Sequence, residues 1–222
     1  MNDSEVIDRF KQTGALLEGH FVLSSGLHSS VYLQCAIALQ ATRDAIDFGA
    51  ALAEHFRDKK IETVASPAVG GIVIGYEVAR QLGVRFIWTE RENGQMTLRR
   101  GFTVSEHERI LVIEDVITTG GSTRDTIEAL QAAGADVVAA GSIIDRSGGR
   151  VDVGVPRVSL ATLDVPAVSP DDQLTTALER FGSTELPLLP VMRGSALVGL
   201  LHRESVIGYV RMREMLGLEG RR

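Results

Sequence analysis

Hydrophobic and polar positions follow two alternating patterns along the first three quarters of the chain. One pattern has helical spacing, and the other is a short apolar run of the kind found in strands buried on both faces. The helical pattern covers residues 43–58, 71–82 and 122–133. The apolar runs cover residues 62–69, 84–89, 109–116, 136–144 and 157–165. Alternating strands and helices predict an α/β fold with a doubly wound, mostly parallel sheet, whose ligands bind beyond the carboxyl ends of the strands.

The most informative of the predicted strand-to-helix turns lies in the run ILVIEDVITTGGST, residues 110–123. It consists of an apolar strand, two adjacent acids, a loop of small residues and the start of a helix. Side chains alternate along a strand, so Glu114 and Asp115 leave it on opposite sides, and at least one can accept hydrogen bonds from ligand hydroxyls. Hydroxyl side chains and open backbone amides at a helix N-terminus form a cradle for phosphate. The run matches neither a Walker A loop nor the GxGxxG dinucleotide fingerprint.

Composition and charge narrow the class of protein. The 222 residues suit one domain of about 150–170 residues plus an appendage. With 44% hydrophobic and 23% charged residues the chain can bury a core, which excludes wholesale disorder. A net charge of −6 argues against nucleic acid as a partner, and no apolar run reaches the roughly 18–20 residues of a membrane span.

Targeting signals and cysteine content point to one compartment. The polar, acidic start of the chain does not have the pattern of a signal peptide. The single cysteine, Cys35, excludes an intramolecular disulfide and a cysteine-based zinc site. We therefore expect a reducing, cytoplasmic location.

The run at 110–123 resembles the phosphoribosyl diphosphate (PRPP) binding motif of type I phosphoribosyltransferases. The resemblance implies that the acid pair contacts the ribose hydroxyls and that residues 118–122 hold the 5-phosphate. The implied PRPP-binding residues are Glu114, Asp115, Val116, Ile117, Thr118, Thr119, Gly120, Gly121 and Ser122. A second turn lies between a predicted strand and a predicted helix, where glycines let the backbone approach a pyrophosphate closely, although a plain turn is the alternative. This pyrophosphate loop comprises Ala68, Val69, Gly70 and Gly71.

Further segments resemble orotate phosphoribosyltransferases, and the resemblance covers roughly residues 5–165. They are GHFVLSSGLHSSVY at 19–32, SPAVGG at 66–71, ERENGQMTLRRGF at 90–102, and the pair Asp145-Arg146. Orotate is a planar acid, and its ring carboxylate suits a bidentate arginine. The resemblance implies that Arg146 and Thr118 bind orotate. It also implies an N-terminal hood that places Ser24 and Tyr32 near the base.

The polar stretch 89–103 is long for a connection in a compact domain, which indicates a lid. The resemblance implies that Arg91, Arg99 and Arg100 close over the pyrophosphate in the neighbouring subunit's site. The lysine and histidine that many members carry in this loop are absent, and Ser24 stands where some members have a lysine. Because arginine supplies charge but does not readily give up a proton, we predict electrostatic stabilisation from this loop rather than acid catalysis.

The remainder of the chain departs from the family's usual ending. Its pattern predicts a helix at 172–181, strands at 186–192 and 196–201, and a helix at 204–216. This small α+β appendage resembles a single CBS repeat, a unit that usually works in pairs and binds adenine nucleotides. A nucleotide sensor and a structural or dimerising appendage are both open interpretations. We place the phosphoribosyltransferase domain at 1–165 and the CBS-like tail at 166–222.

Together these observations predict transfer of the phosphoribosyl group from PRPP to orotate, a step of UMP biosynthesis. The resemblance also implies a homodimer with shared active sites. The resemblance further implies Mg²⁺ that is held mostly by PRPP oxygens and waters, with the acid pair in support. No histidine has metal-ligand spacing. Two alternatives stay open: a purine or uracil phosphoribosyltransferase, which would not need Arg146 or the hood, and a non-catalytic regulator that responds to PRPP or a nucleotide.

Overall fold

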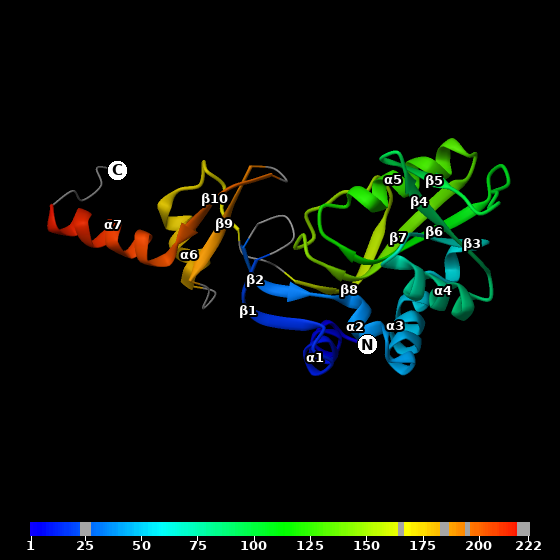
Figure 1. Ribbon diagram of the computed structural model, residues 1–222, viewed down its shortest axis with the longest axis horizontal. Helices are drawn as coiled ribbons and strands as arrows, with labels where there is room; N and C mark the ends of the chain where they lie inside the picture. The colour runs from blue at the N-terminus through cyan, green and yellow to red at the C-terminus, as the bar shows by residue number, and fades with distance from the viewer. Residues whose placement is uncertain (23–27, 164–166, 183–186, 194–195, 217–222) are drawn as a thin grey trace. The chain divides into compact units, whose positions relative to one another are not determined.

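The computed structural model describes residues 1–22, 28–163, 167–182, 187–193 and 196–216 (Figure 1). The chain divides into two compact units, Met1–Asp164 and Val165–Arg222. Among the described residues, no helix is long and apolar enough to cross a membrane.

A six-stranded sheet in the order β5-β4-β3-β6-β7-β8 forms the centre of the first unit. The strands are β3 (Thr63–Pro67), β4 (Arg85–Glu92), β5 (Gln95–Leu98), β6 (Arg109–Ile117), β7 (Asp136–Asp145) and β8 (Arg157–Thr162). All neighbours pair in parallel except β5, which pairs antiparallel with β4 at the edge. The chain adds β4 on one side of β3 and later β6 on the other, so the strand order reverses between β3 and β6. The prediction of a doubly wound, mostly parallel sheet is confirmed.

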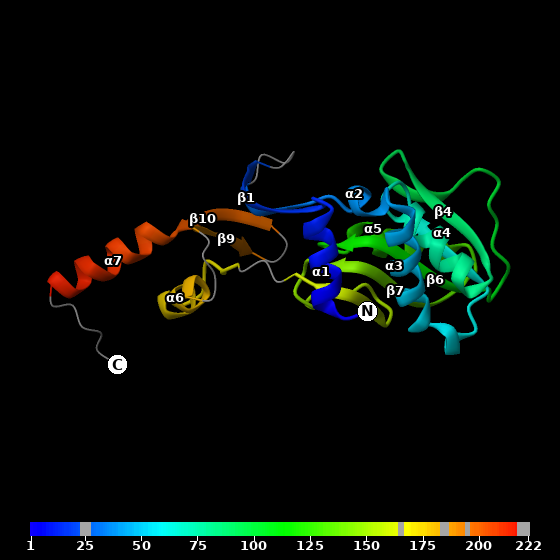
Figure 2. The ribbon, with the colours of Figure 1, turned by 90° about the horizontal axis from the view of Figure 1, so that it is seen from below.

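Helices cover both faces of this sheet (Figures 1 and 2). They are α1 (Asp3–Gln12), α2 (Cys35–Leu39), α3 (Thr42–Glu54), α4 (Gly71–Leu82) and α5 (Gly121–Ala132), with a 3-10 turn at Arg57–Lys59. Leu111 and Ile113 of β6 pack in the core shared with α1 to α4, whereas Ile110 and Val112 pack in the core beneath α5. Burial on both faces explains why β6 is a continuous apolar run. A separate antiparallel hairpin is formed by β1 (Leu16–Val22) and β2 (His28–Leu33).

The segment that we predicted as a long polar lid is partly a β-hairpin. Strand β4 continues to Glu92, and β5 returns along it after a two-residue turn at Asn93 and Gly94. Both turn residues have positive φ, 51° and 83°, as a type I′ turn requires. Within 89–103, only the turn at 93–94 and residues 99–103 lack strand, so the irregular part of the segment is shorter than predicted.

The second unit has the predicted order of helix, two strands and helix. Its elements are α6 (Leu174–Gly182), β9 (Leu188–Arg193), β10 (Ala196–His202) and α7 (Arg203–Met215). The two strands pair antiparallel. A small core joins the elements, formed by Val168, Ala177, Phe181, Leu189 and Val206. The likeness of this unit to a CBS repeat stays a prediction.

Candidate active site

Two of the predicted motifs meet at the reversal of strand order. Because β3 and β6 are adjacent and parallel, the loops that follow them lie at the same edge of the sheet. A Cβ atom at Gly70 would lie 2.8 Å from Oδ2 of Asp115, and one at Gly71 would lie 3.2 Å from Oε1 of Glu114. Glycine is therefore required at 70 because the backbone runs against the carboxylate. The peptide bond between Ala68 and Val69 is cis.

Where these loops converge, Glu114 is buried and Asp115 is half-buried. Burial raises the pKa of Glu114 to about 9, and the neighbouring Asp115 carboxylate contributes to the shift. Burial also raises the pKa of Asp115, against a hydrogen bond from Glu114 and from the Val116 amide, which is 2.8 Å from Oδ1. Glu114 therefore keeps its proton near neutral pH. A pair in that state can accept hydrogen bonds from hydroxyl groups and would repel a polyanion less than two carboxylates would.

Cys35, at the start of α2, belongs to the same cluster, although nothing in its sequence neighbourhood indicates this. Its side chain is buried and its thiol donates a hydrogen bond to Asp115. Burial and both nearby carboxylates raise the pKa of Cys35 far above its ordinary value, so the thiol stays protonated. This burial is typical of a packed cysteine rather than a reactive one.

The predicted phosphate loop, residues 118–122, lies between β6 and the first turn of α5. Thr118, Thr119 and Ser122 are exposed, and no side chain caps the first turn of α5. Its first amide groups, which have no partner inside the helix, are thus available to an anion. Gly120 has a φ of 72°, and a Cβ atom there would lie 2.5 Å from Cγ1 of Val151. Both the backbone conformation and the close packing require glycine.

Arg146 follows β7 at the same edge of the sheet, and its Nε is buried without a hydrogen-bond partner among the described residues. The amide of Arg146 donates to the carbonyl of Ile117 at 2.8 Å, which ties it to the end of β6. Burial lowers the pKa of Arg146. A buried guanidinium nitrogen with a free donor predicts an anionic ligand.

Asp145 fixes the turn that carries Arg146. Its Oδ1 accepts from the amide and hydroxyl of Ser147 at 2.7 and 2.6 Å, and its Oδ2 accepts from the amide of Gly149 at 3.0 Å. Nη1 of Arg157 lies 2.8 Å from the same Oδ2. These partners satisfy the buried carboxylate and lower its pKa, although burial alone would raise it.

Arg91 lies on β4, and Arg99 and Arg100 follow β5. Arg91 pairs with Asp125 of α5 at 2.5 Å. Arg99 lies 3.4 Å from Glu92, and Arg100 lies 2.8 Å from Glu90. Each of these arginines thus has a carboxylate partner in its own chain, and closure over a pyrophosphate stays a prediction. Tyr32 is on β2 and partly exposed, whereas Ser24 lies outside the described residues.

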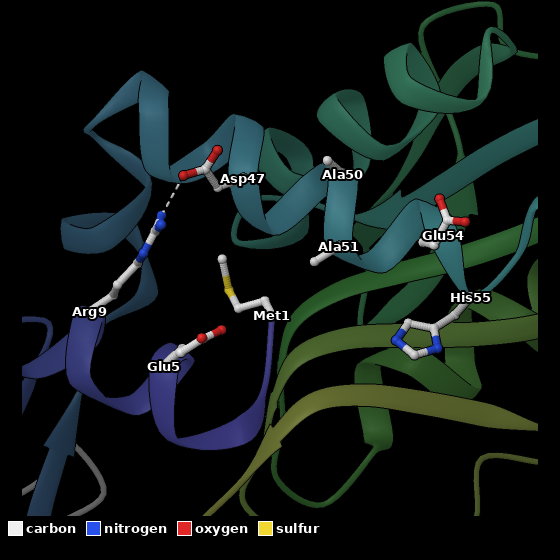
Figure 3. Close-up of a pocket in the computed structure, with 8 residues that line it drawn as sticks. All are labelled: Met1, Glu5, Arg9, Asp47, Ala50, Ala51, Glu54 and His55. Atoms are coloured by element: carbon white, nitrogen blue, oxygen red, sulfur yellow. Dashed lines mark hydrogen bonds and ion pairs between the residues drawn. The ribbon is translucent and has the colours of Figure 1, made fainter.

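A pocket between α1 and α3 contains none of the predicted site residues (Figure 3). Nη1 of Arg9 bridges Oδ1 of Asp44 at 3.1 Å and Oδ2 of Asp47 at 2.7 Å across these helices. The pocket is lined by Met1, Glu5, Arg9, Asp47, Ala50, Ala51, Glu54 and His55.

The doubly wound sheet, with an acid pair and a phosphate loop at its switch point, defines a phosphoribosyltransferase. The family model of the phosphoribosyl transferase domain matches residues 39–166. An orotate phosphoribosyltransferase from Caldicellulosiruptor bescii is 51% identical over 172 residues, which are 78% of this chain and 90% of that protein. One from Thermotoga maritima is 52% identical over 162 residues, 73% of this chain and 87% of that protein. The chain belongs to the orotate phosphoribosyltransferase family.

A solved structure agrees with this assignment. The crystal structure of orotate phosphoribosyltransferase from Aeropyrum pernix matches with a TM-score of 0.57 at 30% identity. The match covers 81% of this chain and 99% of that one.

Proposed function

We propose that this protein transfers the phosphoribosyl group of PRPP to N1 of orotate, giving orotidine 5′-phosphate and pyrophosphate in UMP biosynthesis. The observation that carries the proposal is the buried, unpartnered Nε of Arg146 at the edge that also holds the acid pair and the phosphate loop. A planar carboxylate satisfies a guanidinium through two parallel hydrogen bonds. A purine or uracil phosphoribosyltransferase is not favoured, because an uncharged base would leave this donor without an anion. A non-catalytic regulator is not favoured, because the curated relatives at about 50% identity are enzymes.

The chain's own groups divide the work of the reaction. The acid pair orients the ribose through its hydroxyls, and the amides at the start of α5 hold the 5-phosphate. As the bond from C1′ to the pyrophosphate oxygen breaks and the bond to N1 forms, N1 gives its proton to solvent or to the departing pyrophosphate, on which negative charge develops. The loop at 68–71 approaches that leaving group through its backbone, and Arg91 with Arg99 and Arg100 supplies positive charge.

Magnesium is the expected companion of PRPP. Glu114 and Asp115 offer the oxygen ligands that Mg²⁺ prefers. Within the described ranges, no three histidine, cysteine or acidic side chains are arranged to hold a metal by themselves. This donor set fits an ion bound mainly through PRPP oxygens and waters, with the acid pair in support. The ion would neutralise charge on the departing pyrophosphate.

We extend the proposal to a homodimer with shared sites. On one side of α4 and the preceding loop, Val69, Val73 and Tyr76 are exposed by 82%, 47% and 60%. Val69 belongs to the pyrophosphate loop, so a second copy seated on this surface would reach the site. Sedimentation equilibrium should give twice the chain mass, and Val73→Glu should give a monomer with reduced turnover. A monomeric wild-type protein with full activity would contradict the dimer.

A spectrophotometric assay tests the reaction. Purified protein with PRPP and Mg²⁺ should consume orotate, followed by its ultraviolet absorbance. Arg146→Gln should raise the KM for orotate about 10- to 100-fold, the range expected for lost charge-assisted hydrogen bonds. Consumption of uracil or hypoxanthine instead of orotate would support the rival enzyme class. No turnover of any base would support the regulator.

The role of the tail needs its own measurement. The second unit has only a small core, which is consistent with an appendage that gains stability from association. Calorimetric titration of the full chain with AMP, ATP or S-adenosylmethionine separates the two interpretations. Saturable heat would support a nucleotide sensor, and its absence would support the structural or dimerising appendage.

The free, buried Cys35 fits the reducing cytoplasmic location that we propose.

A further inference from the structure

Arg124 joins two loops at the active edge of the sheet. It lies in the first turn of α5, where its guanidinium forms a bridge between two backbone carbonyls. Nη2 donates to the carbonyl of Thr119 at 2.7 Å, and Nη1 donates to the carbonyl of Asp152 at 2.8 Å. Thr119 belongs to the phosphate loop, and Asp152 belongs to the loop that begins at Arg146. One side chain therefore links the predicted phosphate and orotate subsites.

The bridge sets the direction of a peptide group in the phosphate loop. The bond between Thr119 and Gly120 is trans, so its carbonyl oxygen and the amide hydrogen of Gly120 point in opposite directions. Because Arg124 holds the carbonyl, the amide of Gly120 points away from the guanidinium. Rotation of this peptide would instead turn a partly negative oxygen toward the phosphate and remove a donor.

Packing behind the loop restricts rotation of the peptide group between Thr119 and Gly120. At Gly120, an added Cβ would lie 3.0 Å from Nη1 of Arg124 and within contact of Val151 and Val153. The amide of Arg124 also donates to the carbonyl of Gly120 at 2.9 Å. The loop is thus supported on one side by Arg124 and the two valines, while its threonine side chains stay exposed.

The location of this cation is unusual for a helix. A positive side chain in the first turn is unfavourable, because the helix dipole is positive there and favours acidic residues. No acidic residue occupies the first turn of α5. The two charge-assisted hydrogen bonds to carbonyls offset this cost, which indicates that the bridge itself is the reason for arginine at 124.

We propose that Arg124 is a positioning residue that holds the phosphate loop in the conformation that binds the 5-phosphate of PRPP. The inference rests on the proposed function and adds a residue to its binding machinery. It does not require Arg124 to touch the substrate.

Ribose 5-phosphate is the probe that tests the proposal, because it occupies the phosphate loop and needs no base. Isothermal titration should give a dissociation constant about tenfold higher for Arg124→Met than for the wild type, the effect of one charge-assisted hydrogen bond. In turnover assays, the KM for PRPP should rise by a similar factor while kcat changes less than threefold. Arg124→Lys keeps the charge but lacks the planar fork, so it should also weaken binding at least about fivefold.

Arg109 provides a matched control. Its Nη2 donates to the carbonyl of Lys59 at 2.8 Å and its Nε to the carbonyl of Lys60 at 3.2 Å, at the amino end of β6. Arg109→Met removes the same kind of bridge at the opposite edge of the sheet and should leave ribose 5-phosphate affinity unchanged.

Three results would overturn the positioning role. They are unchanged affinity in Arg124→Met, full affinity in Arg124→Lys, and equal losses in Arg124→Met and Arg109→Met. If Arg124→Met does not fold, Arg124→Lys decides. A wild-type protein that binds ribose 5-phosphate without consuming orotate would contradict the proposed function but leave this test intact.

Discussion

Glu114 keeps a proton at a pH where an exposed glutamate has lost it. Its pKa is about 9 in the folded chain, raised by burial, whereas its ordinary value is 4.5. Between these two values the folded state binds a proton that the unfolded state releases. The contribution of Glu114 to stability is therefore complete below pH 4.5 and is lost as the pH rises toward 9.

The proton on Glu114 should make the melting temperature depend on pH. We expect the melting temperature of the ligand-free protein to fall between pH 5 and pH 9, and Glu114→Gln to flatten much of that fall, since glutamine does not titrate. Thermal denaturation across this range is the measurement, and Glu128→Gln, an exposed position on α5, is the control. Equal slopes in Glu114→Gln and the wild type would contradict the buried proton.

The contribution of Asp145 to stability depends on pH in the opposite direction from that of Glu114. Hydrogen bonds from Ser147 and the ion pair with Arg157 hold its pKa below the ordinary value of 3.8. Its contribution is present above pH 3.8 and is lost as the pH falls further. The carboxylate is almost fully buried, with 2% of its side chain exposed.

Asp145→Asn should therefore affect both folding and recognition. Loss of the buried pair leaves Arg157 uncompensated and should lower the free energy of unfolding by about 3 kcal/mol. The loosened turn should also raise the KM for orotate more than the KM for PRPP. Urea denaturation and steady-state kinetics measure the two effects. A loss of stability with unchanged KM values would show that Asp145 supports the fold but does not position Arg146.

In the loop between β3 and α4, the backbone at Gly70 lies close to the carboxylate of Asp115. Gly70→Ala places a methyl group 2.8 Å from Oδ2 of Asp115, so either the loop or the carboxylate must move. We expect at least a tenfold loss of kcat/KM for PRPP, equal to about 1.4 kcal/mol. Gly208→Ala is the control, because no atom lies within 4 Å of its added Cβ and alanine favours the helix α7. Similar losses in both variants would contradict this explanation.

Local patterns predicted most strands and helices, and the features that they missed include one local hairpin and several contacts between residues far apart in the chain. Residues 110–123 form one contiguous run, so the order of strand, acid pair, glycine loop and helix could be predicted from the sequence. The β4–β5 hairpin was missed although Asn93-Gly94 is a strong hairpin signal, because the polar residues around it resembled a loop. Cys35 reaches Asp115 only after folding, and the bridge from Arg124 to Asp152 depends on how two loops pack. Single-sequence patterns carry no information on such pairs.

At the scale of the whole chain, the first unit carries every predicted substrate residue that the structure describes. The family match ends at residue 166, close to the boundary between Met1–Asp164 and Val165–Arg222. We expect a chain shortened after Asp164 to keep its kcat and both KM values within about twofold, or roughly 0.4 kcal/mol. Kinetics of the shortened and full chains measure this. A large loss of activity with an intact fold would assign the tail a part in catalysis.

The reversal of strand order between β3 and β6 couples ligand binding to the stability of the folded chain. The loops after both strands contribute to the site, so a bound ligand would hold β3 and β6 together at the centre of the sheet. Ligands that bind only the folded state stabilise it by mass action. Substrate should thus protect the backbone amides of β3 and β6 from hydrogen exchange and the whole first unit from proteolysis. In this way the supply of PRPP would set the lifetime of the enzyme as well as its rate.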